Sequence, residues 1–546
     1  MADRFRWTLI IGGIALLLGV VMEVPQLRYI LNPASRGVLV GLSTDESLYR
    51  ARVEEALAGN PAHATQPFTG EPWAPGAQFA LIEQTEGLAF RWTGWRAATV
   101  FQIMDFVIPV FLFLTIFALF RFAQFGRRRS LFGALLFLLP VLYGLNRPVH
   151  QRTSSLLVLV TILLAMHALE KRSLRYALAS GFLLGTLQGV YLWSWMFAWI
   201  YIGLLFLWEL AAWWRSRPRE NLRDSRFGTL IVLCVIGVIS ALPYVFLTFS
   251  LSKLPLYQEM AWRQALHAGR WPESWIYSLL FLAMSAGLLL ALRSRPELAG
   301  RKRFILLFPI AVLVLINQQL IHGHIFLFTS HSVFPVFFGA VSAVLLGSLL
   351  WNKWLMLPLL AALPLIGGIA WDNRAVFSQF SGAAYRLNET HFASLLPVLD
   401  NLPRATILSD PDTSAFIAGQ TRHDILSIIY LDSALMSNQE LAERLCLSLL
   451  PYPPEARQID ERKHLIWPEA NRVRAEEGVH QREIALMKST CATEDRDPAS
   501  YLEKYGVRYV VWDQRRSPEW DPKNLKVKLE KDSEEAGAWV LYRIVY

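Results

Sequence analysis

The residues best suited to chemistry are two adjacent carboxylates, Asp45 and Glu46, at the start of a helical pattern that ends near Gly59. A carboxylate can act as a general base by taking the proton of a hydroxyl group in the transition state. Helical spacing places Asp45 on one face with Tyr49, whereas Glu46 faces Arg50 one turn later and can pair with it. Asp45 is therefore the freer of the two carboxylates and the better candidate for a base.

The same pair of carboxylates also has a purely structural interpretation. Ser43 or Thr44 can cap the helix, and acidic residues are favoured in a first turn because the helix dipole places positive charge there. The residue pattern alone does not separate this interpretation from a catalytic one.

Cationic and histidine side chains that could hold an anionic group lie in three short segments between apolar runs, at about 146–152, 250–273 and 322–332. Such groups can stabilise the charge that develops on a leaving phosphate. Anchoring at the membrane interface is the alternative role for each of them. The candidates for substrate or phosphate binding are Arg147, His150, Arg152, Arg263, Arg270 and His331, together with Tyr49.

A divalent metal ion, Mg or Mn, is a further candidate at this site, and no cofactor is required by the sequence. Its ligands would be Asp45, Glu46 and His324. A metal site needs three or four ligands with fitting geometry, which the motif His322-x-His324 does not supply alone. Asp105 is a separate candidate, because an acid inside an apolar run is costly unless it has a function or a partner in the bundle.

The elements that position these residues are membrane-spanning helices. Of the 546 residues, 54% are hydrophobic, and many lie in runs of the ~20 apolar residues that cross a bilayer core ~30 Å thick as a helix. Barrel strands, which alternate over ~10 residues, do not fit these runs. The sequence predicts an α-helical polytopic membrane protein with about eleven transmembrane helices. The runs fall at about 7–27, 99–120, 131–145, 153–169, 175–191, 193–214, 227–249, 274–292, 304–321, 333–351 and 353–371.

Charge predicts the orientation of these helices. With the N-terminus in the cytoplasm, the inside segments contain 20 Lys and Arg residues and the short outside segments contain 5. This asymmetry has the sign of the positive-inside rule. It also accounts for the net charge of +9 without a nucleic-acid partner. The predicted organisation is a transmembrane domain over 1–371, which includes a first outside loop at 28–98, and an extracytoplasmic domain over 372–546.

The tail 372–546 is polar and alternates strand-like with helical stretches, which predicts a soluble α/β domain. Cys446 and Cys491 both lie in it and could pair in an oxidising compartment, although sequence spacing leaves this open. The predicted strands are Ala405–Leu408, Tyr509–Trp512 and Trp539–Val545, and the predicted helices are Gln439–Leu450 and Ala499–Tyr505.

A first spanning helix followed at once by an outside loop with Asp-Glu-x-x-Tyr resembles the membrane glycosyltransferases of the GT-C superfamily. The most similar subgroups are the aminoarabinose and protein-mannosyl transferases and related bacterial members. Segments 146–152, 317–331 and 501–509 also resemble parts of bacterial members, so the resemblance covers most of the chain. It is carried by topology more than by specific motifs.

The resemblance implies that Asp45 is a general base, with Glu46 orienting it or binding a metal ion. Asp45 would activate an acceptor hydroxyl, which attacks the sugar of a polyprenyl-phosphate donor with inversion. The expected partners are a polyprenyl-phosphate-linked sugar donor, a lipid or glycan acceptor and membrane lipid, with no nucleic acid. The expected location is a bacterial inner membrane, with the N-terminus in the cytoplasm and the tail in the periplasm.

Two other functions share this topology. A transporter or flippase for lipid-linked sugars would be favoured by inverted repeats, and the sequence contains none. A glycan polymerase or ligase would place its key basic residues in a late outside loop. The tail also lacks the Trp-Trp-Asp signature of oligosaccharyltransferase catalytic subunits, which argues against en bloc glycan transfer to asparagine.

Overall fold

The computed structural model divides the chain into two units. The first comprises residues 1–25, 103–247 and 268–382, and the second comprises residues 26–102, 248–267 and 383–546. The structure describes all residues except 1, 32, 37, 40–45, 63–67, 69–77, 143–151, 217–220, 223–224, 264–269, 273, 295–299, 324–330, 332, 349–361, 363–365, 368–386, 429–430, 432–433 and 458–476.

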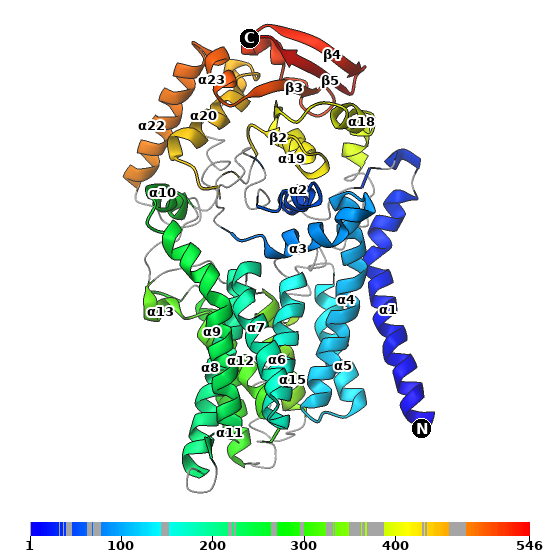
Figure 1. The fold of residues 1–546 in the computed structure, drawn as a ribbon, viewed down its shortest axis with the longest axis vertical. Coiled ribbons are helices and arrows are strands. Elements are labelled where there is room, and N and C mark those ends of the chain that lie inside the picture. The colour runs from blue at the N-terminus through cyan, green and yellow to red at the C-terminus, as the bar shows by residue number, and fades with distance from the viewer. Residues whose placement is uncertain are drawn as a thin grey trace. The chain divides into compact units, whose positions relative to one another are not determined.

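The described part of the first unit is helical (Figure 1). Within it α6 packs against α7, α7 against α8, and α12 against α8, α11 and α15. The apolar helices of the chain are α1 (Ala2–Ile30), α4 (Ala97–Phe122), α5 (Arg127–Val141), α6 (Ser154–Lys171), α7 (Leu174–Val190), α8 (Leu192–Ser216), α9 (Arg226–Leu251), α11 (Trp275–Ser294), α12 (Arg303–Leu315) and α15 (Val333–Gly347), and the short α13 (Gln319–His322) follows α12.

Six segments in the described residues are long and apolar enough to cross a membrane: α1, α4, α6, α8, α9 and the stretch from α12 through α13. Two shorter apolar helices, α11 and α15, accompany them. The chain is therefore a multi-pass membrane protein. Ten of the eleven predicted apolar runs coincide with helices. The eleventh, 353–371, lies almost wholly outside the described residues, so the count of eleven stays a prediction.

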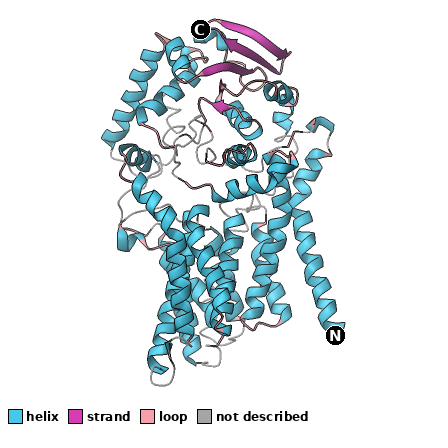
Figure 2. Ribbon diagram, viewed as in Figure 1, coloured by secondary structure: helices cyan, strands magenta, loops and turns pink. Residues whose placement is uncertain are grey.

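The second unit contains a five-stranded sheet of order β2-β1-β3-β5-β4 (Figure 2). β1 is parallel to β2 and β3, whereas β5 is antiparallel to both β3 and β4. The strands are β1 (Thr406–Leu408), β2 (Asp424–Ile425), β3 (Val507–Asp513), β4 (Leu529–Glu535) and β5 (Trp539–Ile544). The tail helices are α18 (Leu395–Asp400), α19 (Pro411–Gln420), α20 (Asn438–Leu449), α22 (Glu477–Glu494) and α23 (Pro498–Lys504). The predicted strands and helices of the tail are confirmed.

Both faces of this sheet are buried in apolar clusters, because successive side chains of a strand point to opposite faces. Ile407 and Val511 lie in one cluster and Val510 lies in the other. The first cluster also contains Leu48 and Ala51 of α2 (Glu46–Leu57), which belongs to the predicted first outside loop. The loop that follows the first apolar helix is therefore part of the hydrophobic core of the tail domain.

Strand β4 was not predicted, because its sequence Leu-Glu-Lys-Asp-Ser-Glu-Glu has no apolar alternation. It lies at the edge of the sheet and pairs only with β5. Charged side chains on an edge strand discourage pairing with other chains, which explains why such a polar segment is found there.

The question left open for the tail cysteines is answered by a disulfide between Cys446 of α20 and Cys491 of α22, 45 residues apart in sequence. Helices α20 and α22 also pack against each other. Closing a loop of this length lowers the conformational entropy of the unfolded chain, by about 4 kcal/mol in the chain-entropy model.

We expect the variant C491S to lower the free energy of unfolding of the tail by about 2–4 kcal/mol, because the unfolded state regains loop entropy. Denaturation of the detergent-solubilised chain, followed by tail tryptophan fluorescence, measures this loss. Cys234, the other cysteine, is not in a disulfide. The matched control C234A should therefore still lose stability on addition of reductant, whereas C491S should not respond.

Candidate functional site

Helix α2 begins at Glu46, the residue that follows Asp45. The Glu46 carboxylate pairs with Arg50 one turn later, with Arg50 Nη2 at 2.7 Å and Nε at 2.9 Å from Glu46 Oε1. Both side chains are only 3% exposed. The pairing predicted from i, i+4 spacing is confirmed, and it is a buried ion pair rather than a surface one.

Arg50 also contacts Leu39, the last described residue before the segment that contains Asp45. Its Nη1 donates a hydrogen bond to the Leu39 carbonyl at 2.8 Å. The same carbonyl accepts a second hydrogen bond, 2.7 Å long, from Gln420 Nε2 of α19. One guanidinium therefore connects the residue before segment 40–45 with the residue after it. We call Arg50, Glu46 and the Leu39 carbonyl the arginine clasp.

Further buried charges hold α2 in place. Arg52 Nη1 lies 2.9 Å from Glu83 Oε1 of α3 (Leu81–Phe90), and both side chains are buried. Burial raises the pKa of Glu83, and the adjacent Arg52 opposes this shift. Arg404 Nη2 lies 2.8 Å from Glu55 of α2 and 2.7 Å from Asp424 of β2. Ion pairs therefore connect α2 to α3, which is also in the first outside loop, and through Arg404 to strand β2 of the sheet.

Glu54 on the same helix receives the first N–H group of α4. Its Oε1 accepts a hydrogen bond of 2.7 Å from the Ala97 backbone. Burial raises the pKa of Glu54 to about 7, although this hydrogen bond and the nearby Arg96 lower it in part. The carboxyl group therefore titrates near neutral pH.

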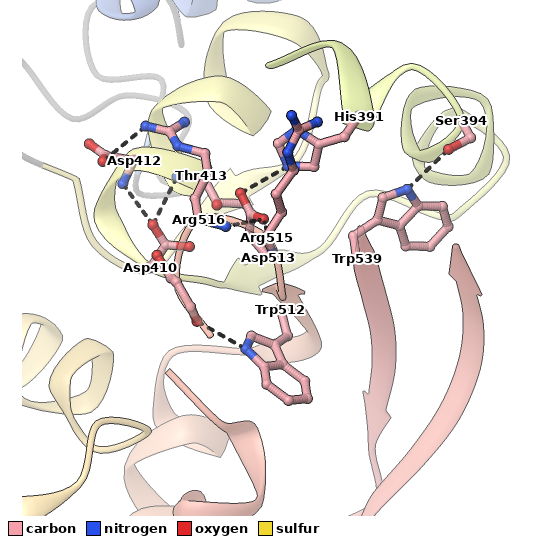
Figure 3. A network of polar contacts seen from close by, with 11 residues as sticks. His391, Ser394, Asp410, Asp412, Thr413, Trp512, Asp513, Arg515, Arg516 and Trp539 are labelled. Atoms are coloured by element: carbon pink, nitrogen blue, oxygen red, sulfur yellow. Dashed lines mark hydrogen bonds and ion pairs between the residues drawn. The ribbon is translucent and has the colours of Figure 1, made fainter. Parts of the chain in front are cut away.

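Sequence reasoning missed a second polar cluster, at the carboxyl ends of the parallel strands β1 and β3 (Figure 3). Asp513 Oδ2 lies 3.0 Å from His391 Nε2, and Asp513 Oδ1 accepts hydrogen bonds of 3.0 Å from the backbone N–H groups of Arg515 and Arg516. Asp410 caps α19 by accepting from two backbone N–H groups. Burial raises the pKa of Asp410.

Charge connects this cluster to the arginine clasp. Glu389 interacts electrostatically with Arg50 and Arg516, which lower its pKa, and with Glu46, which raises it. Burial is the largest effect and raises the pKa of Glu389 overall. Asp410-Pro411 could have predicted the start of α19, but no local signal connects residues 389–391 with residue 513.

The remaining predicted residues of the second unit have partners inside it. Tyr49 is 1% exposed, and the Arg52 guanidinium lies 5.9 Å from its ring centroid. Arg263, at the end of α10 (Pro255–Arg263), has no exposed surface. Its guanidinium donates to Asn438 Oδ1 at 2.8 Å and to the carbonyls of Ala434 and Met436 at 2.9 Å. These contacts favour a structural role for Arg263, linking α10 to the start of α20.

Three predicted residues lie in the first unit. Arg152 forms a buried ion pair with Asp105, which gives the intramembrane acid a partner. His331 Nδ1 shares a hydrogen bond of 2.7 Å with the Tyr191 hydroxyl, and its ring stacks on Trp193 at 4.1 Å.

Arg270 is exposed and donates to the carbonyls of Leu320 and Ile321 at 3.1 and 3.0 Å. Arg152, His331 and Arg270 are thus each held by a different set of partners.

Asp45, Arg147, His150 and His324 lie outside the described residues. Among the residues that the structure describes, no three His, Cys, Asp or Glu side chains gather in a way that could hold a metal ion. Of the three candidate metal ligands, only Glu46 is within them, and its carboxylate is bound by Arg50.

No protein-family model matches the chain, and no curated protein matches it. Among solved structures, ArnT from Cupriavidus metallidurans bound to undecaprenyl phosphate is similar, with 13% sequence identity over 98% of both chains and a TM-score of 0.45. The arabinofuranosyltransferase AftD from Mycobacteria is similar over 99% of this chain and 40% of its own, with 15% identity and a TM-score of 0.46.

Removing one partner of the arginine clasp should be costly. We expect R50M to lower the free energy of unfolding by about 3–5 kcal/mol, because the Glu46 charge stays buried without its cation. The double variant E46Q/R50M should lose clearly less, since no charge is then left uncompensated. Denaturant titration of the purified chain measures both. Equal losses of unfolding free energy in R50M and E46Q/R50M would show that the uncompensated Glu46 charge is not the cause of the loss.

The raised pKa of Glu54 predicts a pH dependence of stability. Between the unfolded value of 4.5 and the folded value of about 7, the folded state binds more protons, so the free energy of unfolding falls as pH rises. The full effect is roughly 3 kcal/mol. E54Q keeps an acceptor for Ala97 but does not titrate. The unfolding free energy of E54Q, measured by urea titration, should change less between pH 5 and pH 8 than that of the parent. An equal change in the two proteins would contradict the raised pKa of Glu54.

Proposed function

We propose that the protein is an inverting glycosyltransferase of the GT-C type, which moves a sugar from a polyprenyl-phosphate donor to an acceptor hydroxyl. The observation that carries this proposal is the arginine clasp, which holds both flanks of segment 40–45 through Leu39 and Glu46. A general base must be held in place relative to its substrate, because small displacements of a reacting group are costly to rate. The clasp supplies such support for a catalytic Asp45.

In the proposed reaction Asp45 removes the proton of the acceptor hydroxyl as its oxygen attacks the anomeric carbon of the donor sugar. The bond between that carbon and the phosphate oxygen breaks, and the electron pair leaves with the polyprenyl phosphate. Attack from the face opposite the phosphate inverts the configuration. Glu46 orients the base through Arg50.

The leaving phosphate requires a cation at the membrane. Among the described candidates Arg270 is exposed, and the half-buried His331, which hydrogen-bonds with Tyr191, is the second proposed group. Arg147 and His150 complete the proposed set from the sequence. Arg152 pairs with Asp105 and Arg263 donates to tail carbonyls, and these contacts favour a structural role for both over phosphate binding.

The proposed location is a bacterial inner membrane with the tail outside the cytoplasm. The disulfide between Cys446 and Cys491 supports this, because disulfides persist in oxidising compartments and are rare in the cytosol. It agrees with the orientation predicted from the distribution of Lys and Arg. On that side lipid-linked sugars would reach the first outside loop, residues 28–98, which we call loop one.

The test compares the parent chain with D45N in membranes supplied with polyprenyl-phosphate sugars. We expect transfer to fall by about 100- to 10,000-fold, because the amide cannot accept the proton. The matched control is D532N on the edge strand β4, whose carboxylate pairs with Arg543 and lies far along the chain from loop one. D532N should transfer at the parental rate.

Full activity in D45N would remove the catalytic assignment. Transport of lipid-linked sugar across sealed vesicles without bond formation would instead identify a flippase. The assay is run with added Mg, with added Mn and with EDTA, because a role for a divalent ion bound by Asp45, Glu46 and His324 predicts loss of activity in EDTA.

A further inference from the structure

A cavity of about 300 Å³ lies within the second unit, lined by residues of loop one and of the tail. This volume is at the lower end of the range for small-molecule sites. Leu39, the last described residue before segment 40–45, forms part of its wall, and so does Gln420, which holds the Leu39 carbonyl. The cavity thus adjoins the point where the segment bearing Asp45 begins.

One part of the wall is polar and charged. Arg36 and Arg96 contribute guanidinium groups, and Asp400 contributes a carboxylate. Arg96 pairs with Asp400, and Arg36 Nη1 lies 3.2 Å from Glu535. Each cation therefore already has a carboxylate partner, which for Arg36 is Glu535, a residue outside the lining, so an anion would compete with a carboxylate for either guanidinium.

Most of the rest of the wall is apolar and includes Val38, Ala98, Leu396 and Pro397, and the uncharged polar side chains are those of Thr99 and Gln420. A ligand that fits should therefore offer both hydrogen-bond donors and acceptors and apolar C–H surface. An uncharged ligand is favoured, because an ion would have to compete with a carboxylate for Arg36 or with an arginine for Asp400. A sugar ring has these properties: its hydroxyls donate and accept, and its C–H face is apolar.

We propose that this cavity binds an uncharged sugar residue, and that this residue belongs to the acceptor. Asp400 accepts hydrogen bonds from its hydroxyls and Arg96 donates to them, while Leu396 and Pro397 contact its C–H face. That the bound sugar is part of the acceptor rests on the proposed function. Binding of a sugar in the cavity does not rest on it, since binding requires neither donor nor turnover. The inference specifies that the acceptor hydroxyl is carried by a carbohydrate.

Saturation-transfer NMR on the detergent-solubilised full chain tests this inference. The probes are the methyl glycosides of glucose, mannose, galactose and arabinose. Inorganic phosphate, which has no carbon-bound protons to observe, is the anionic probe and is followed by phosphorus NMR line broadening. We expect saturable binding of at least one glycoside and none of phosphate. Saturable binding of phosphate, or of no glycoside, would overturn the proposal.

Variants then locate the binding. L396W places an indole in the cavity and should weaken glycoside binding by at least ~10-fold, as expected when the ligand's place is filled. The matched control is L402W, the same change at a half-buried leucine that does not line the cavity. Equal binding in L396W and the parent would place the sugar elsewhere and overturn the inference.

D400N adds no volume to the cavity wall, so it tests glycoside binding there even if L396W does not fold. Loss of a charge-assisted hydrogen bond should weaken glycoside binding by about tenfold, whereas an anion site would gain affinity for phosphate. D45N should bind the glycoside as the parent does. If the parent chain binds the glycoside but transfers no sugar, the result therefore counts against the proposed function and not against the cavity.

Discussion

A buried guanidinium determines much of this architecture. Arg50 has 3% of its surface exposed, and an unpaired charge in such a place is strongly unfavourable. Its hydrogen bonds satisfy it only if Glu46 and the Leu39 carbonyl lie on either side of it. Leu39 and Glu46, the described residues on either side of segment 40–45, are thereby both held by Arg50. Because α2 also contributes Leu48 to the core of the sheet, the helix that carries the clasp is anchored in the hydrophobic core of the second unit.

The tail supports the loop through a continuous set of polar contacts. Gln420 at the end of α19 holds the Leu39 carbonyl, and Asp410 caps the start of the same helix. Asp513 lies beside this cap and orders the turn after β3. Loop one and tail are therefore not a catalytic loop with a separate appendage. They form one folded unit, in which a sugar bound against the tail would lie beside the loop that carries the proposed base.

The candidate site was predicted from sequence only where its contacts are local. The pairing of Glu46 with Arg50 followed from i, i+4 spacing, because one helical turn fixes which side chains meet. The roles of the cationic residues were less predictable, since an arginine that binds phosphate and an arginine that stabilises the fold have the same sequence signature. Only contacts between remote residues show that Arg152 pairs with Asp105 and that Arg263 binds the carbonyls before α20. His391 and Asp513, 122 residues apart, gave no local signal.

The sequence by itself determined ten of the apolar helices, the α/β character of the tail and, to within one residue, the boundaries of α20 and α23, because hydropathy and periodicity depend on consecutive residues. Tertiary structure decided what joins distant parts: the Cys446–Cys491 disulfide, the polar strand β4 at the sheet edge, and the packing of loop one into the tail core. The physical reason is that burial and pairing depend on distance in space. For residues hundreds of positions apart, sequence spacing does not encode that distance.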